Sequence, residues 1–258
     1  MASRWRWFHQ LGSPKWFFEK SAKWLPWIWV STLILLAVGL YYSLWASPIE
    51  ARQGQGHTVR IMYIHVPAAA LSMIGYVAMA IASTIGLVWK MKMAFAASRA
   101  IAPIGAAMTF IALFTGAVWG KPTWGTWWEW DARLTSELLL LFLYLGFIAL
   151  HSSFAERAKA DKAAAVLAIV GVINVPIIYF SVKWWNTLHQ GFSVTQKGAL
   201  APEFQVPLFT MIGAFYLLFI GLVIMRLRVE ILMREQKSRW VADWATEQKT
   251  QKAPKRGL

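Results

Sequence analysis

Six long apolar runs separated by short polar segments restrict the fold more than any other feature of this 258-residue sequence. Each run is long enough to cross the hydrocarbon core of a membrane, which is about 30 Å thick. Hydrophobic residues make up 58% of the chain, more than a soluble core of this length would bury. We therefore predict an all-α membrane protein. Its six transmembrane helices are expected near residues 25–46, 66–89, 100–120, 134–154, 164–184 and 206–226.

Basic residues are unevenly distributed among the segments that flank the six runs. The segments on one face, which include both chain ends, hold 20 of the 26 Lys and Arg residues. Cytoplasmic segments of membrane proteins carry such an excess, so we expect both termini in the cytoplasm. The net charge of +14 then reflects orientation in the membrane, and nucleic acid is not an expected partner. The chain divides into a basic N-terminal segment (1–24), a transmembrane domain (25–226) and a charged cytoplasmic tail (227–258).

The opposite, outer face carries an unusual concentration of tryptophan. Four of the 17 Trp residues lie within the polar segment 121–133, and we call them the Trp cluster: Trp124, Trp127, Trp128 and Trp130. A helix over 121–133 would place three of them and Asp131 on one side, which predicts an amphipathic helix in the plane of the lipid headgroups. An ordinary interfacial aromatic belt is the alternative. Four Trp residues around one Asp favour a flat aromatic surface that binds a planar ligand.

Two histidines flank the Trp cluster on the outer side. His65 stands two residues before Pro67, at the start of the second run, and His189 follows the fifth run. A single interfacial His often only extends a polar tip toward water. Two neutral imidazoles, however, can fill both axial positions of a haem iron. Outer bases available to pair with the haem carboxylates are Arg60, Lys121, Arg133 and Lys183.

The other chemically active residue types are few. His57 lies in a Gly-rich outer loop and is a weaker ligand candidate, whereas His9 and His151 are interpreted as structural or incidental. The chain has no Cys, which excludes disulfides and thiolate ligands. It also lacks a Gly-rich loop ending in Gly-Lys-Ser/Thr, so any ATP hydrolysis would come from a partner. We expect no catalytic residue and do not expect an enzyme.

The segment Trp124-Gly125-Thr126-Trp127-Trp128-Glu129-Trp130-Asp131 resembles the WWD signature of the haem-handling proteins of bacterial cytochrome c maturation. Within that group the chain resembles the CcmC family over nearly its whole length. The resemblance includes Tyr63-Ile64-His65-Val66-Pro67 and Trp184-Trp185-Asn186-Thr187-Leu188-His189-Gln190. The related CcmF and CcsA proteins carry the same signature but are longer, so chain length argues against them.

The resemblance implies a haem b site on the periplasmic face of the bacterial inner membrane, with His65 and His189 as the axial ligands. The Trp cluster would lie against the haem and present it to the haem chaperone CcmE, assisted by CcmD. CcmA and CcmB would form the associated ABC ATPase. The full set of haem-contacting residues expected from the residues and the resemblance together is His65, His189, Trp124, Trp127, Trp128, Trp130, Asp131, Arg133 and Arg60.

Two other classes of protein fit parts of the sequence. A membrane b-type cytochrome would use the two histidines for electron transfer, but it gives the Trp cluster and Asp131 no role. A transporter or scaffold could bind lipid or glycan on the Trp cluster, but it gives the histidines no role. Haem delivery uses both features, and it is the function we predict.

Overall fold

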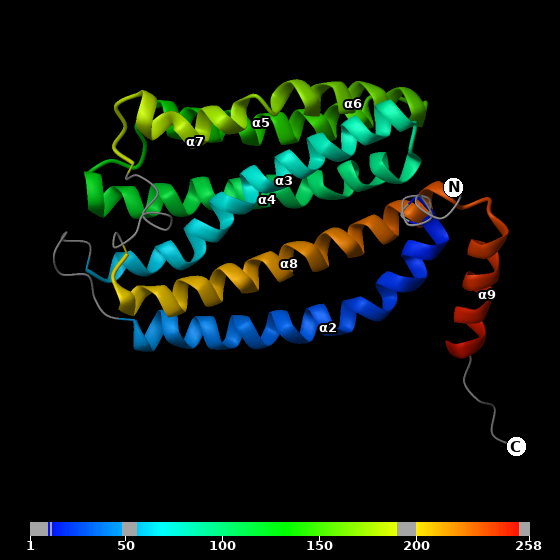
Figure 1. The fold of residues 1–258 in the computed structure, drawn as a ribbon, viewed down its shortest axis with the longest axis horizontal. Coiled ribbons are helices and arrows are strands. Elements are labelled where there is room, and N and C mark those ends of the chain that lie inside the picture. Colours follow the sequence, from blue (N-terminus) through cyan, green and yellow to red (C-terminus); the bar gives the residue numbers. More distant parts are fainter. Residues whose placement is uncertain (1–9, 11, 48–55, 190–199, 253–258) are drawn as a thin grey trace, which may run out of the picture.

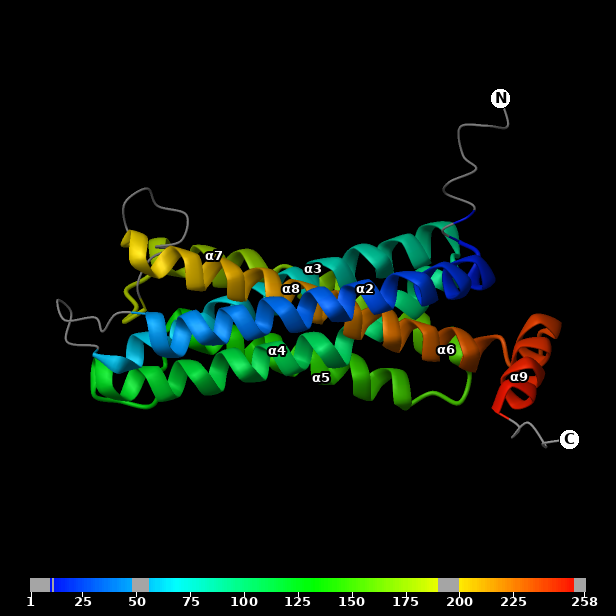
Figure 2. The same cartoon turned by 90° about the horizontal axis from the view of Figure 1, so that it is seen from below.

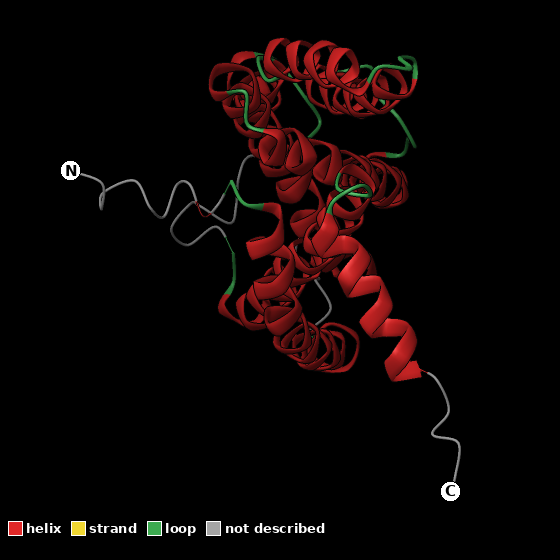
Figure 3. Ribbon diagram, turned by 90° about the vertical axis from the view of Figure 1, so that its right-hand side faces the viewer, coloured by secondary structure: helices red, strands yellow, loops and turns green. Residues whose placement is uncertain are grey.

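The computed structural model of the chain describes residues 10, 12–47, 56–189 and 200–252. Every regular element within these residues is a helix, and the described part contains no strand (Figure 3). Six helical stretches are long and apolar enough to cross a membrane, which confirms the predicted class of an all-α, multi-pass membrane protein. They are Pro14–Ala46, His57–Trp89, Lys92–Trp124, Ala132–Ser152, Arg157–Trp184 and Pro202–Arg234.

The helices lie side by side along most of their length (Figures 1 and 2). Helix α3 packs mainly on α4, and α2 packs on α8, while α5 lies between α4 and the α6–α7 pair. The bounds are α2 (Pro14–Tyr41), η1 (Tyr42–Ala46), η2 (His57–Ile61), α3 (Met62–Trp89), α4 (Lys92–Trp124), α5 (Ala132–Ser152), α6 (Arg157–Gly171), α7 (Asn174–Trp184), α8 (Pro202–Arg234) and α9 (Arg239–Lys252).

The helix ends follow from local capping chemistry. Ser13 caps α2 by accepting a hydrogen bond from the Trp16 amide, and Pro14 occupies the first helical turn, where its missing N–H costs nothing. Helix α2 therefore begins ahead of the apolar run and passes position 24 without a break. Lys90, with a φ of 52°, ends α3 and makes the tight turn into α4.

The segment 121–133 differs from the single amphipathic helix predicted for it. Helix α4 continues through Pro122 to Trp124, and Gly125 then ends it with a φ of 80°, a conformation that Gly adopts without steric cost. Residues 125–131 form no helix, and Asp131 caps α5 by accepting a hydrogen bond from the Leu134 amide at 2.8 Å. The helical prediction for 125–131 is therefore wrong, because a Gly stop and an Asp cap divide the segment.

The middle of the bundle is held by tyrosines packed against small residues. The Tyr144 hydroxyl donates a hydrogen bond to the Ser72 carbonyl at 2.8 Å, and its ring lies edge-on to Tyr76 with centroids 4.9 Å apart. A Cβ at Gly105 would overlap the Tyr144 ring, so α4 and α5 can approach only where α4 has no side chain. This contact fixes the spacing of the two helices that also form walls of the pocket described below.

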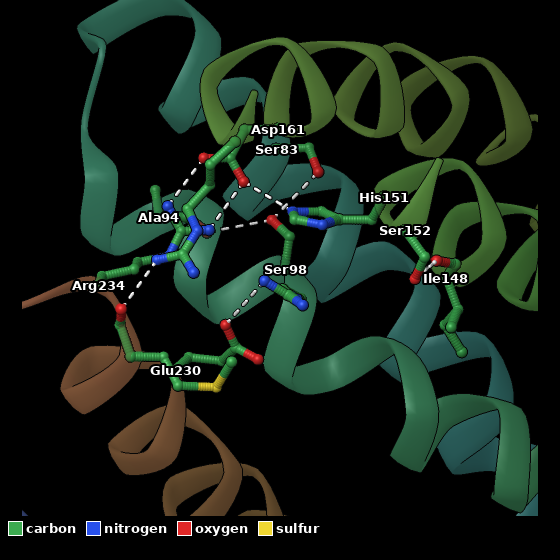
Figure 4. Close-up of polar contacts among 12 residues, drawn as sticks. Ser83, Ala94, Ser98, Ile148, His151, Ser152, Asp161, Glu230 and Arg234 are labelled. Carbon is green, nitrogen blue, oxygen red and sulfur yellow. Dashed lines mark hydrogen bonds and ion pairs between the residues drawn. The ribbon is translucent and has the colours of Figure 1, made fainter. Parts of the chain in front are cut away.

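Buried charges join the helices at the end of the bundle near α9 (Figure 4). The Arg234 guanidinium donates two hydrogen bonds to Asp161, at 2.8 and 2.7 Å, and His151 Nε2 lies 2.8 Å from the same carboxylate. Glu230, fully buried, lies 3.3 Å from an Arg99 nitrogen. These contacts link α4, α5, α6 and α8, and they confirm a structural role for His151.

The charged C-terminal tail contains helix α9. Its Trp240 and Trp244 pack on Phe18 of α2, with ring centroids 5.5 and 5.3 Å apart. Arg228 of α8 stacks on the same ring at 3.9 Å and donates hydrogen bonds to the Phe18 carbonyl and the Ser21 hydroxyl. The tail is thus attached to α2.

Candidate functional site

A pocket lies between α3, α4 and α5 at the end of the bundle opposite α9. The cavity itself has a volume of about 80 Å³, and about 810 Å³ of empty space, open solvent included, lies along its walls. Its walls are mostly apolar and aromatic, with a few polar groups, as in sites that bind large organic ligands. The lining residues are His65, Ala69, Met73, Ala112, Leu113, Gly116, Ala117, Trp119, Gly120, Thr123, Trp124, Trp128, Arg133, Leu134, Glu137 and His189.

His65 stands on the first turn of α3 and is held from one side of its ring. Its Nδ1 lies 3.0 Å from the Ala112 carbonyl and 3.1 Å from the Thr115 hydroxyl. A proton on Nδ1 can be donated to the carbonyl, which leaves Nε2 as the atom able to bind a metal. Trp119 meets the ring edge-on at 5.8 Å, and Gly116 leaves room for it. Helix α4 therefore fixes both the tautomer and the orientation of His65.

His189 approaches the same space from the segment that follows α7. The ring centroids of His65 and His189 are 6.1 Å apart, and their planes differ by 32°. Two imidazoles on opposite sides of one iron place their centroids about 6 Å apart, because each metal–nitrogen bond is about 2 Å and each nitrogen lies about 1 Å from its ring centre. Trp124 lies 6.1 Å from the His189 ring. The structure thus brings together the two histidines that the sequence analysis selected.

Asp131 lies outside the pocket lining and connects the two loops beside it. One carboxylate oxygen caps α5, and the other accepts a hydrogen bond from the Thr187 hydroxyl. The Thr187 oxygen in turn accepts a hydrogen bond from the His189 amide at 3.1 Å. Asp131 therefore contacts the segment that carries His189, and not the space between the two histidines.

The Trp cluster divides into two pairs. Trp124 and Trp128 line the pocket, whereas Trp127 and Trp130 do not line it and remain 55% and 74% exposed. The Trp130 ring meets Trp128 edge-on with centroids 5.4 Å apart. The four residues consequently form a pocket wall backed by an exposed aromatic surface, rather than one flat face.

The two predicted arginines have different positions. Arg133, on the first turn of α5, lines the pocket and is 9% exposed. Arg60, in η2, lies outside the lining and donates a hydrogen bond to the Ser47 carbonyl at 3.0 Å. The Ser47 hydroxyl lies 2.5 Å from the Tyr63 hydroxyl. Arg60 therefore attaches the end of the first helical stretch to the start of α3.

Several pocket residues were not predicted from the sequence, because they lie on helices and not in the outer loops. Trp119 and its neighbours on α4 follow helical spacing along one face, and that periodicity could have identified them. This face consists of Ala112, Gly116, Trp119, Gly120 and Thr123. Glu137 lies one turn after Arg133 and accepts a hydrogen bond from Ser72 at 2.7 Å. Its position four residues after Arg133, on the same face of the helix, could have indicated that it lies beside Arg133.

The two histidines, His65 and His189, suit a metal ion that is already bound by other ligands. Among the described residues there is no group of three or more His, Cys, Asp or Glu side chains placed to hold a metal ion. Two neighbouring imidazoles supply only two of the ligands that a metal ion needs. A porphyrin supplies four in-plane nitrogens and needs only the two axial ones, so the pocket and its histidines fit haem.

The fold and site define a class: a multi-pass helical membrane protein with an aromatic pocket between two histidines at one end of the bundle. Residues 7–242 match the model of the CcmC family, Heme exporter protein C. The chain belongs to this family. It is 48% identical to Heme exporter protein C of Escherichia coli over 239 residues, which cover 93% of this chain and 96% of the relative.

Relatives from other bacteria match over similar lengths. Heme exporter protein C of Bradyrhizobium diazoefficiens is 52% identical over 230 residues, covering 88% of this chain and 86% of the relative. The protein of the same name from Rhodobacter capsulatus is 39% identical over 232 residues, covering 89% and 95%. Residues 7–242, which match the family model, include all six membrane-spanning stretches and the pocket.

Proposed function

We propose that this chain binds haem b between His65 and His189 at the periplasmic face of the inner membrane and presents it to the chaperone CcmE for cytochrome c maturation. The close approach of the two rings carries the proposal, because a distance of 6.1 Å between their centroids suits one iron between them. Membership of the Heme exporter protein C family supports haem as the ligand. The anchored Nδ1 of His65 adds support, because metal-binding histidines commonly donate their other N–H to a carbonyl.

The pocket residues have separate tasks in this proposal. Trp124, Trp128 and Trp119 provide stiff aromatic area against the macrocycle. Arg133 pairs with a propionate, for which a guanidinium offers two parallel hydrogen bonds. Glu137 lies one helical turn away and partly balances the Arg133 charge, so that the buried wall is not strongly positive. Haem is the cargo here, and the chain binds and orients it without a catalytic step.

The exposed half of the Trp cluster is suited to a partner protein. Trp127 and Trp130 face away from the pocket while belonging to the loop that forms its wall. Aromatic residues are enriched where proteins bind each other. We assign this surface to the chaperone, with CcmD assisting, and we assign ATP hydrolysis to CcmA and CcmB because this chain has no nucleotide-binding loop. A b-type cytochrome would need no such exposed surface beside its haem.

A co-expression experiment tests the proposal. The full-length chain is produced with the chaperone, and two quantities are measured: haem that co-purifies with the chain and haem attached covalently to the chaperone. Trp127→Ala and Trp130→Ala should keep the first and lower the second. Trp45→Ala is the control, because Trp45 is 73% exposed but lies outside the loop. A wild-type chain that carries no haem would contradict the proposal, and equal loss of both quantities would make these Trp residues part of the binding site.

A further inference from the structure

We infer that Asp131 and Thr187 are positioning residues that set the place of the His189 imidazole; this inference rests on the proposed haem function. Asp131 belongs to the Trp-rich loop, and Thr187 belongs to the segment after α7, far away in the chain. The two meet through a hydrogen bond from the Thr187 hydroxyl to Asp131 Oδ2. The relay continues through the His189 amide, which donates to the Thr187 oxygen at 3.1 Å.

Asp131 is itself fixed by hydrogen bonds to both carboxylate oxygens, so it can hold the segment that carries His189 in place. Its Oδ1 accepts the Leu134 amide hydrogen bond at 2.8 Å, so both carboxylate oxygens have fixed donors. Helix α5 continues directly into the pocket wall through Arg133 and Glu137. The backbone of His189 is thus tied to the helix that forms one wall, while His65 is tied to α4 through Ala112.

Such a tie is needed because His189 does not stand on a helix. Helix α7 ends at Trp184, and residues 185–189 have no regular structure. A ring on an irregular segment can move by several ångströms unless other contacts fix its backbone, whereas metal ligands tolerate displacements of only about 0.5 Å. The hydroxyl of Thr187, between a carboxylate and the His189 amide, supplies that constraint.

The Trp cluster and the histidine are also coupled by this arrangement. Trp124, which ends α4, lies 6.1 Å from the His189 ring, and Asp131 ends the same loop. Moving the loop therefore moves both the aromatic wall and the second axial histidine. The Asp of the WWD signature acts in this account through hydrogen bonds to protein and does not touch haem.

Three substitutions separate the relay from helix capping. Thr187→Val removes the hydroxyl and keeps the side-chain shape. Asp131→Ser keeps a good capping residue for α5 but is too short to reach Thr187. Thr187→Ser keeps the hydroxyl and is the matched control.

The full-length variants are purified in detergent and titrated with haem b, and the absorption spectrum reports how many axial ligands the iron has. Thr187→Val and Asp131→Ser should each weaken binding by about 10- to 100-fold, the usual effect of losing a hydrogen-bond partner that supports a metal ligand. Both should shift haem toward one axial ligand, and added imidazole should restore two. Thr187→Ser should resemble the wild type. The double variant should lose no more than either single variant, because both break one relay.

A measurement without haem completes the test. Amide hydrogen exchange of residues 187–189 should be faster in Thr187→Val and Asp131→Ser than in the wild type. Faster exchange with an unchanged haem spectrum would overturn the inference, because the bonds would then only hold the segment. A normal spectrum for Thr187→Val beside an altered one for His189→Ala would also overturn it and would leave the proposed function intact. An unaltered His189→Ala spectrum would instead contradict the axial assignment itself.

Discussion

At the scale of single residues, the proposed ligand His65 is held in place by groups on α4. The Ala112 carbonyl and Thr115 hydroxyl meet one ring nitrogen, and Gly116 faces the ring where a side chain would crowd it. A Cβ at position 116 would lie 3.1 Å from His65 Cε1, closer than carbon atoms normally pack. The wall of α4 therefore specifies where the imidazole stands.

Gly116→Ala should displace His65 without removing any donor atom. We expect weaker haem binding and a spectrum shifted toward one axial ligand, measured by titrating the purified variant with haem. Gly146→Ala is the matched control, because its Cβ would meet Leu167 at an ordinary 3.4 Å. If both variants bound haem as the wild type does, the close approach of α4 to His65 would not matter for haem binding, and the argument for Gly116 would be contradicted.

The sequence allowed the prediction of the histidine pair but not of the residues that support it. The pair was predicted from residue type, outer position and the resemblance to the CcmC family, and the structure places the two rings close together. Ala112 acts through its backbone carbonyl, which no side-chain pattern reveals. Thr187 depends on a contact with Asp131, 56 positions away in the chain, and such a contact becomes visible only in the folded molecule.

At the scale of elements, the six apolar runs identified the helices correctly, and capping residues determined where they end. Helix α2 extends to Pro14 because a polar first turn is compatible with a helix that begins outside the apolar run. The loop 125–131 was missed because a regular Trp spacing suggested a helix. Gly125 ends α4 and Asp131 caps α5, and both are local signals that divide the segment.

The contact of α4 with α5 at Gly105 should be sensitive to any added atom. Gly105→Ala places a methyl group in the space of the Tyr144 ring, and we expect a loss of about 1–3 kcal/mol in unfolding free energy from overpacking. Thermal unfolding in detergent measures the change. Gly213→Ala is the control, because its Cβ would meet only Leu35 at 3.4 Å, and its stability should be unchanged or higher. Equal stability of the two variants would contradict the packing argument.

At the scale of the whole molecule, the two ends of the bundle have different composition and different tasks. One end holds the aromatic pocket. The other end holds α9 and the cluster of Asp161, Arg234 and His151 (Figures 1 and 4). This division agrees with a pocket on the periplasmic side and basic segments on the cytoplasmic side, the orientation that the charge bias predicts. Stability and ligand binding should therefore respond to different substitutions.

His151→Ala should test that separation. The variant removes a buried partner of Asp161, and we expect a stability loss of about 1–3 kcal/mol. The haem spectrum should be unchanged, because His151 is at the opposite end of the bundle from the pocket. Ser152→Ala, at an exposed neighbouring position, should change neither property. A haem spectrum altered by His151→Ala would show that the two ends are coupled.

The orientation itself can be measured with reporter fusions. Reporters placed after Trp89, after Phe154 and at the C-terminus should be active only as cytoplasmic reporters, whereas one at Gly125 should report the periplasm. The first two sites lie in the connections at the α9 end of the bundle, and Gly125 lies beside the pocket. A periplasmic C-terminus would contradict the proposed orientation and would place the pocket on the cytoplasmic side.

The proposed function requires that one haem iron is bound by His65 and His189 together. Electron paramagnetic resonance of the oxidised, haem-loaded chain tests it most directly, because the spin state of the iron depends on the number and strength of its axial ligands. We predict a low-spin signal for the wild type and for His57→Ala, whose side chain is exposed and outside the pocket. His65→Ala and His189→Ala should each give a high-spin signal that returns to low spin when imidazole is added. A low-spin signal retained in either variant without imidazole would contradict the claim.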